Sequence, residues 1–233
     1  MNIAKQRVAV LGGTSGIGYA TAAAAAEQGA EVVVVSRDPE RVRQAASRLG
    51  ATGLAADLSD PPATLFDEIG PFDHLVYTAG EALTLMPVAS IDPARAREFF
   101  GVRYFGALAA VRAALPHLRP GGSITLTTGT AGDRPSPGWS VASSICGAMD
   151  SLTRALAVEL APIRVNAVKP GVTRSPLWGD GEDVETLYAT TAATVPLGRV
   201  GEVSDVAGAY LYLMGQPFTT GTILTVDGGA LLA

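Results

Sequence analysis

Three glycines near the start of the chain have a spacing that could form a backbone site for a phosphate group. Gly12, Gly16 and Gly18 lie in LGGTSGIG, residues 11–18, directly after an apolar run. They would allow a tight turn, a close approach of the backbone to a pyrophosphate, and close packing of the next helix, whose first amides favour negative charge. The alternative is an ordinary strand-to-helix turn, but the strand before it and the helix after it favour a phosphate site.

Ser36 ends the second apolar run and Arg37 follows it, at the place where the adenosine ribose of a dinucleotide would lie. An acidic residue at this point accepts a hydrogen bond from the free ribose 2′-hydroxyl of NAD. A hydroxyl and a guanidinium suit a 2′-phosphate instead, because arginine offers a fixed, fully charged set of donors. NADP(H) is therefore favoured over NAD(H), unless Arg37 only faces solvent.

The elements that must position these residues follow from short apolar runs and helix-period segments. Runs at 7–11, 31–36, 73–78, 123–128, 164–169 and 223–227 are too short for helices and predict buried parallel strands. An alanine-rich helix is expected over 21–28 before Gly29, another from Asp38-Pro39 to Gly50, and a third from Asp92-Pro93.

The alternation predicts an α/β fold in a single domain over residues 1–233. We expect a Rossmann-type, doubly wound parallel sheet of about seven strands with helices on both faces, and a ligand beyond the carboxyl ends of the strands. The longest irregular connection, around 172–200, is expected to contain helix pairs that form a mobile lid over that crevice.

Composition limits the class of protein and its partners. With 48% hydrophobic and 17% charged residues, the chain is typical of a globular domain. A net charge of −5 without a basic run argues against nucleic acid or anionic membrane as a partner, and no segment approaches the ~18 apolar residues of a membrane span. The single cysteine, Cys146, excludes an internal disulfide and supplies no metal site. The start has too short an apolar stretch for a signal peptide, so we expect a cytoplasmic protein with a small-molecule substrate.

The spacing G-x-x-x-G-I-G at 12–18 resembles the short-chain dehydrogenase/reductase family. Further segments agree: Asp57 in AADLSD, TAG at 78–80, GSITLTT at 122–128, LTRALAVELAPIRVNA at 152–167 and VDGGALLA at 226–233. The resemblance covers the whole chain, with a shortened segment between Asp57 and Phe72. It implies homodimers or homotetramers, assembled through the helices that include 92–115 and 142–160 and through the last strand.

The resemblance also implies which residues bind the cofactor, with Asp57 at the adenine and Ser175 at the carboxamide of the nicotinamide. The complete expected set is Gly12, Thr14, Ser15, Gly16, Ile17, Gly18, Ser36, Arg37, Asp57, Leu58, Ala79, Gly80, Pro170, Gly171 and Ser175.

The residues that usually perform carbonyl reduction in this family are missing. Its members use a Tyr as acid, a Lys four residues later, a Ser and an Asn; alignment on GAMDSLTRALAVEL places these at Ala142, Cys146, Gly129 and Arg103. No shift of the alignment restores the pair, because the only lysines are Lys5 and Lys169 and no tyrosine precedes either by four positions.

Three residues are candidates to replace them. Lys169, where the family commonly has a small residue, could hold the nicotinamide ribose or act as an acid with a burial-lowered pKa; a cation paired with a carboxylate, or reaching solvent, is the alternative. Arg103 could supply an electrophilic or substrate-anchoring cation, or form a surface salt bridge. Thr128 stands beside the missing Ser, although an unactivated hydroxyl is a poor acid.

Three functional hypotheses remain. The favoured one is an NADP(H)-dependent oxidoreductase with a divergent site, acting on a small, largely apolar carbonyl or iminium compound. The second is a non-catalytic NADPH-binding partner or sensor, as the loss of all four residues suggests. The third is a non-redox isomerase, cyclase or lyase that uses the crevice as an apolar chamber. Oxidation of the cofactor separates the first from the other two.

Overall fold

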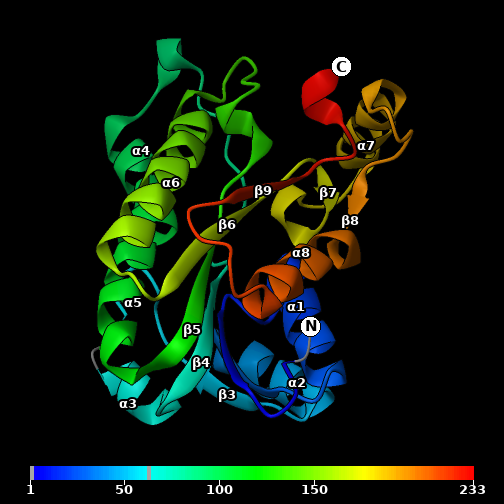
Figure 1. The fold of residues 1–233 in the computed structure, drawn as a ribbon. Coiled ribbons are helices and arrows are strands. Elements are labelled where there is room, and N and C mark those ends of the chain that lie inside the picture. The colour runs from blue at the N-terminus through cyan, green and yellow to red at the C-terminus, as the bar shows by residue number, and fades with distance from the viewer. Residues whose placement is uncertain (1–2, 62–63) are drawn as a thin grey trace.

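The computed structural model describes residues 3–61 and 64–233 (Figure 1). Within these ranges, seven parallel strands form one sheet in the order β3-β2-β1-β4-β5-β6-β9. Their bounds are β1 Arg7–Leu11, β2 Glu31–Ser36, β3 Thr52–Ala55, β4 Phe72–Tyr77, β5 Leu118–Thr127, β6 Arg164–Pro170 and β9 Ile223–Val226. The order reverses at β1, so the crevice beside β1 and β4 is the place where such sheets bind ligands.

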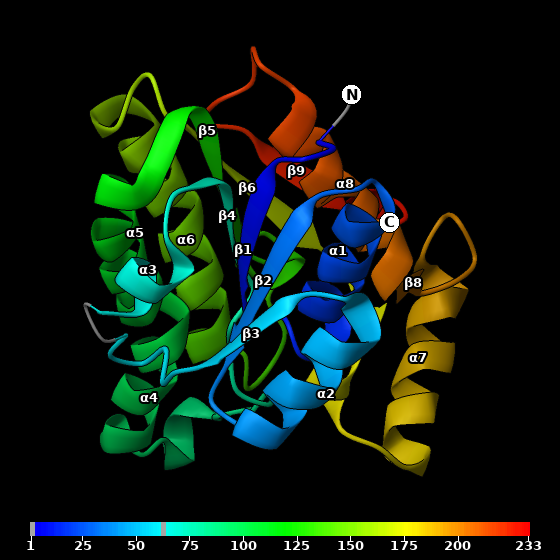
Figure 2. The ribbon, with the colours of Figure 1, turned by 90° about the horizontal axis from the view of Figure 1, so that it is seen from below.

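Helices cover both faces of this sheet (Figure 2). The helices α1 Gly16–Glu27, α2 Pro39–Leu49 and α8 Val203–Gly215 pack on one face, whereas α3 Thr64–Ile69, α4 Pro93–Phe100, α5 Ala107–Ala114 and α6 Ser140–Glu159 pack on the other. Alternate strand residues feed two separate apolar cores: Val8 and Val10 point toward α1 and α8, while Ala9 and Leu11 point toward the opposite layer. The doubly wound fold predicted from the alternating pattern is confirmed.

Helix ends follow the predicted signals. The Asp38 side chain accepts hydrogen bonds from the first amides of α2, and Gly50 ends that helix in the left-handed conformation. Asp92 caps α4 in the same way. The first helix begins at Gly16, earlier than the expected 21, because the glycine loop itself forms its first turn. The edge strand β3 was not predicted, since TGLA is short and contains Gly53.

A π-helix, Gly101–Gly106, joins α4 to α5. Such wider turns are rare and occur often at functional sites. Here the Val102 carbonyl accepts a hydrogen bond from the Tyr77 hydroxyl at 2.5 Å, which ties the turn to the end of β4. This attachment fixes the position of Arg103, the next residue along the π-helix.

The connection from 172 to 200, where helix pairs were expected, holds one α-helix and two shorter elements. It contains β7 Thr173–Arg174, a 3-10 turn at Pro176–Trp178 and the helix α7 Glu182–Thr194. β7 pairs in parallel with β8 Gly201–Glu202 in a separate small sheet. Residues 62–63, inside the segment expected to be shortened, lie outside the described residues. Of the helices that the structure describes, none has the length and hydropathy to cross a bilayer.

Candidate active site

Two adjoining cavities form one crevice at the carboxyl ends of the central strands. Their walls come from the segments that follow β1, β2, β4, β5 and β6. The residues common to both cavities are Thr78, Ala79, Arg103, Thr127, Thr128, Pro170 and Leu177. The two cavities are therefore neighbours that share part of their walls.

The larger cavity, of about 410 Å³, has the predicted cofactor residues on its walls. Those among its lining residues are Gly12, Thr14, Ser15, Gly16, Ile17, Gly18, Ser36, Arg37, Leu58, Ala79, Gly80, Pro170 and Ser175. Gly171 lines the smaller cavity instead. Asp57 is exposed and is not among the cavity-lining residues that the structure describes; its carboxylate accepts hydrogen bonds from the Ser59 amide and hydroxyl, which lower its pKa.

Close backbone packing explains the glycines at 12 and 18. A Cβ on Gly18 would lie 2.2 Å from the Gly12 carbonyl oxygen, and one on Gly12 would lie 2.6 Å from the Ala79 amide nitrogen. Gly12 also has φ of +91°, which side-chain-bearing residues rarely adopt. The loop after β1 is thereby held against the loop after β4, with its backbone exposed to the cavity.

Positive charge gathers where the adenosine end of a dinucleotide would lie. Arg37 lines the larger cavity, and so does Arg41 from the first turn of α2, which the sequence reasoning missed. Its spacing, four residues after Arg37 across a helix start, was the available signal. Arg41 also pairs with the exposed Asp38 carboxylate at 3.6 Å. With Ser36 on the same cavity wall, the two guanidiniums make this end of the cavity suited to a phosphate.

The smaller cavity, of about 150 Å³, is mainly apolar. Its apolar lining includes Leu83, Phe99, Trp139, Ile145, Met149, Leu177 and Trp178. Ala142 and Cys146 face it from successive turns of α6, and Gly129 lies close by, so that a Cβ there would be 3.2 Å from the Cys146 sulfur. Burial raises the pKa of the Cys146 thiol, which agrees with a packing role and not with a nucleophile.

Arg103 is the cation at the junction of the two cavities. Its guanidinium packs 4.9 Å from the centre of the Phe99 ring and lies over Gly80, where a Cβ would be 2.7 Å from its central carbon. Nη2 donates to the main-chain carbonyl of Glu81. Within the described part of the chain, Nε is buried without a hydrogen-bond partner. Burial lowers the pKa of Arg103. None of the ion pairs among the described residues includes Arg103, so the alternative of a surface salt bridge is not what the structure shows.

Thr128 lines both cavities, but its hydroxyl proton is already engaged. The hydroxyl donates to the Cys146 carbonyl at 2.9 Å, and the Thr128 amide donates to Val168. Thr127 similarly donates to the Tyr77 carbonyl at 2.6 Å. The Thr127 hydroxyl also lies 2.6 Å from the hydroxyl of the buried Tyr210, which must donate to it. Both donor protons are therefore engaged within the protein, and of the two hydroxyls only that of Thr128 has no second partner among the described residues.

Lys169 is held away from the crevice, and its expected burial-lowered pKa is wrong. Its ammonium forms ion pairs with Asp133 and Asp150, the latter at 2.7 Å. Burial alone would lower the pKa of Lys169, but the hydrogen bonds and charges of the two carboxylates outweigh it and raise the pKa overall. Lys169 is not among the described residues that line either cavity, so the alternative of a carboxylate-paired cation is the one observed.

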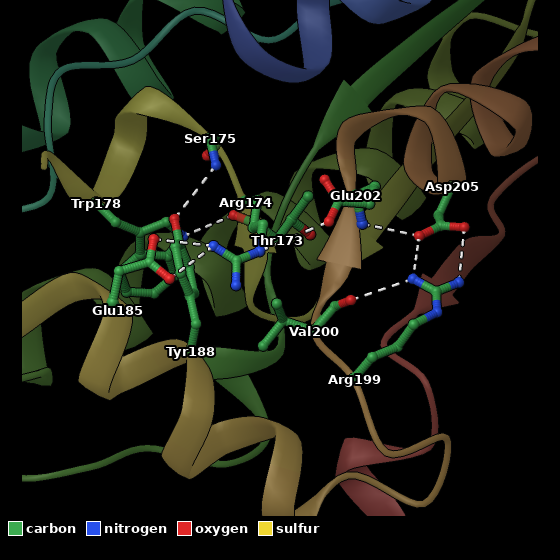
Figure 3. Close-up of polar contacts among 10 residues, drawn as sticks. All are labelled: Thr173, Arg174, Ser175, Trp178, Glu185, Tyr188, Arg199, Val200, Glu202 and Asp205. Atoms are coloured by element: carbon green, nitrogen blue, oxygen red, sulfur yellow. Dashed lines mark hydrogen bonds and ion pairs between the residues drawn. The ribbon is translucent and has the colours of Figure 1, made fainter.

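The segment 172–200 is tied down beside the apolar cavity (Figure 3). Arg174 donates to both carboxylate oxygens of Glu185 on α7 at 3.0 Å, and its guanidinium lies 4.4 Å from the centre of the Tyr188 ring. The Trp178 indole donates to the Thr173 carbonyl at 2.9 Å, and its ring lies 6.0 Å from that of Trp139. These contacts place Trp178 and Leu177 on the cavity wall; Tyr188 packs beneath the loop.

A family model described as Enoyl-(Acyl carrier protein) reductase matches residues 12–230. Among curated proteins, the chain is 37% identical to the short-chain dehydrogenase/reductase ATR9 of Stachybotrys chlorohalonatus, over 97% of each chain. It superimposes on the MalC reductase/Diels-Alderase of Malbranchea aurantiaca with a TM-score of 0.92 at 30% identity, covering 99% of this chain and 98% of that one.

A second solved structure is the NADPH-bound short chain oxidoreductase of Pseudomonas aeruginosa PAO1, which contains an atypical catalytic center. It has a TM-score of 0.89 at 30% identity and covers 98% of this chain and 97% of that one. The matches extend over nearly the whole chain, and the high TM-scores show that the fold is shared. The protein belongs to the short-chain dehydrogenase/reductase family.

Proposed function

We propose that this protein is an NADP(H)-dependent oxidoreductase that acts on a small, largely apolar carbonyl or iminium compound without the family's usual Tyr and Lys. One observation supports the proposal most: a cavity lined by the glycine loop and by Arg37 and Arg41 shares seven wall residues with an apolar cavity beside it. A hydride donor and an apolar acceptor could meet at that junction.

The residues present fit NADP(H). The glycine loop leaves a backbone cradle that a Cβ on Gly12 or Gly18 would fill. Ser36, Arg37 and Arg41 offer the donors that a 2′-phosphate needs. The similarity to the NADPH-bound oxidoreductase from Pseudomonas aeruginosa supports the same choice.

When bound, reduced nicotinamide supplies a hydride, and the protein must stabilise the charge that develops on the acceptor. Arg103 is the positive group at the junction, and the apolar walls strengthen its field by excluding water. A buried guanidinium stabilises the oxyanion of a carbonyl but repels a cationic iminium, so of the two substrate kinds a carbonyl fits better. Ala142 has no acidic proton, and burial raises the pKa of the Cys146 thiol and so weakens it as an acid. In this proposal the proton comes from water or from the substrate itself.

The segment 172–200 serves in this proposal as the lid of the apolar cavity. Leu177 and Trp178 form part of its wall, and Arg174 fixes their position relative to α7. We also propose that the protein is a cytoplasmic homodimer or homotetramer. Exposed apolar side chains on the outer helix layer, Phe105, Leu108 and Val158, support an association through that layer.

Calorimetric titration with NADPH and, separately, NADH tests the cofactor assignment. We expect NADPH to bind more tightly, and Arg37→Ala to weaken NADPH binding by about 10- to 100-fold, because a charge-assisted hydrogen bond is lost, with little effect on NADH. Arg48→Ala, which removes an exposed arginine near the far end of the following helix α2, is the matched control. Equal affinities for the two nucleotides, or no effect of Arg37→Ala, would contradict the assignment.

The similarity to a reductase/Diels-Alderase, together with the apolar cavity, favours a cyclase as the second candidate. In that case substrate would be converted without oxidation of NADPH. A protein that binds NADPH but converts no substrate of the apolar carbonyl, iminium or diene classes would instead fit the non-catalytic partner or sensor.

A further inference from the structure

The ribose at the nicotinamide end of the cofactor needs hydrogen-bond partners in the crevice, and the inference about them rests on the proposed NADP(H) binding. Since the hydride-donating ring must reach the apolar cavity, its ribose must lie near the junction, beside Ala79 and Arg103. Its two neutral hydroxyls need hydrogen-bond acceptors there, because burying an unpaired hydroxyl is costly.

The positions that could hold this ribose, judged from the family resemblance and from the sequence, offer no free hydrogen-bonding group. Ala142 and Cys146 stand where the resemblance places the Tyr and Lys, and neither offers a strong acceptor or donor. Lys169, the replacement suggested by the sequence, is engaged by Asp133 and Asp150. Another residue must therefore face the hydroxyls.

Glu81 has a suitable position and an unused hydrogen-bond acceptor for this role. It follows the Ala79-Gly80 turn after β4, is half-buried, and lines the larger cavity next to Arg103. Its main-chain carbonyl, not its carboxylate, accepts from Arg103. Within the described residues, Oε2 is buried and has no hydrogen-bond partner, and the same holds for Nε of Arg103. The carboxylate therefore has acceptor capacity that no described residue uses, and a rotation of the side chain toward the larger cavity would offer it to a ligand.

We infer that the Glu81 carboxylate, placed beside Arg103, accepts hydrogen bonds from the vicinal hydroxyls of the ribose at the nicotinamide end of NADP(H). An acidic residue does the same for the adenosine ribose in NAD-binding members of this fold class. Glu81 thus binds the two neutral hydroxyls, while the guanidinium of Arg103 keeps the carboxylate from carrying an uncompensated negative charge into the cavity.

The sign of the effect on NADPH affinity separates this role from simple electrostatics. NADPH is an anion, so removing a carboxylate that only lies nearby would tighten its binding. Removing an acceptor that the ribose uses would weaken binding instead. Because the support of Arg103 comes from the main chain of residue 81, Glu81→Ala and Glu81→Gln leave that contact in place.

The test is calorimetric titration of wild type, Glu81→Ala and Glu81→Gln with NADPH and with adenosine 2′,5′-bisphosphate, which lacks the nicotinamide riboside. We expect Glu81→Ala to weaken NADPH about tenfold, Glu81→Gln to weaken it less, and the bisphosphate to bind all three proteins equally. Glu68→Ala, on the exposed side of α3, is the charge-matched control. Thermal melting confirms that each variant is folded.

NADPH affinity that is unchanged or increased in Glu81→Ala would overturn the inference, and so would an equal loss for both ligands. Wild-type protein that fails to bind NADPH would instead overturn the proposed function. That result is distinguishable, because it appears before any substitution is made.

Discussion

Replacing Lys169 by methionine tests whether this lysine belongs to the fold or to the site. Its side chain is 6% exposed and pairs with Asp150, whose side chain is 12% exposed, and with Asp133, which is 47% exposed. Without the ammonium, Asp133 can turn to water, but Asp150 keeps a buried charge whose Oδ1 already lacks a partner among the described residues.

The expected loss of stability follows from that geometry. Breaking a buried pair by removing one partner costs about 3–5 kcal/mol, and because Asp133 is half-exposed we take the lower end, about 3 kcal/mol. For a chain of this size that lowers Tm by about 6–12 °C. Adding Asp150→Asn to Lys169→Met removes the unpaired charge and should recover most of the loss.

Denaturant unfolding near pH 7, with linear extrapolation, measures these free energies. Because the folded-state pKa of Lys169 is raised, the wild-type advantage is complete below the ordinary lysine pKa and is lost only as the pH rises through the folded value. Lys5→Met is the matched control, since Lys5 is the other lysine and is exposed. If Lys169→Met lowers the free energy of unfolding by less than about 0.5 kcal/mol, the structural role is refuted. Weaker NADPH binding by a Lys169→Met protein that is as stable as wild type would instead indicate that Lys169 binds the cofactor.

Two further predictions concern the fold that supports the site. Gly18→Ala should destabilise the protein by about 1–3 kcal/mol and weaken NADPH binding, because the new Cβ would lie 2.2 Å from the Gly12 carbonyl oxygen. The control Gly208→Ala, where no described atom lies within 4 Å of the new Cβ, should stabilise the protein by about 0.5–1 kcal/mol. Denaturant unfolding that shows Gly18→Ala to be as stable as Gly208→Ala would contradict this prediction. Burial lowers the pKa of His74 to about 4. Below about pH 6.5 the unfolded chain therefore binds a proton that the folded chain does not, and the free energy of unfolding should fall by about 3 kcal/mol between neutral pH and pH 4. A His74→Gln variant that loses stability equally steeply over this range would show that His74 is not the cause.

Much of the fold could be predicted because its signals are local. Short apolar runs bounded by glycine and proline indicated all the central strands, and Asp38, Gly50 and Asp92 marked helix ends through contacts with their own neighbours. The edge strand β3 was missed because its four residues, TGLA, are too short and too glycine-containing to show a strand pattern, and only the pairing with β2 reveals it.

The sequence by itself determined the family, the glycine loop and the absence of a Tyr/Lys pair, because these depend on residue identity and spacing alone. Only the tertiary structure decided what the remaining polar groups do. Asp133 and Asp150 lie 36 and 19 residues from Lys169 in the chain, yet they surround its ammonium and raise its pKa. A π-helix brings Arg103 against Gly80 and Glu81, which no periodicity indicated. Charge and burial depend on which distant segments meet, and that is a property of the packed chain.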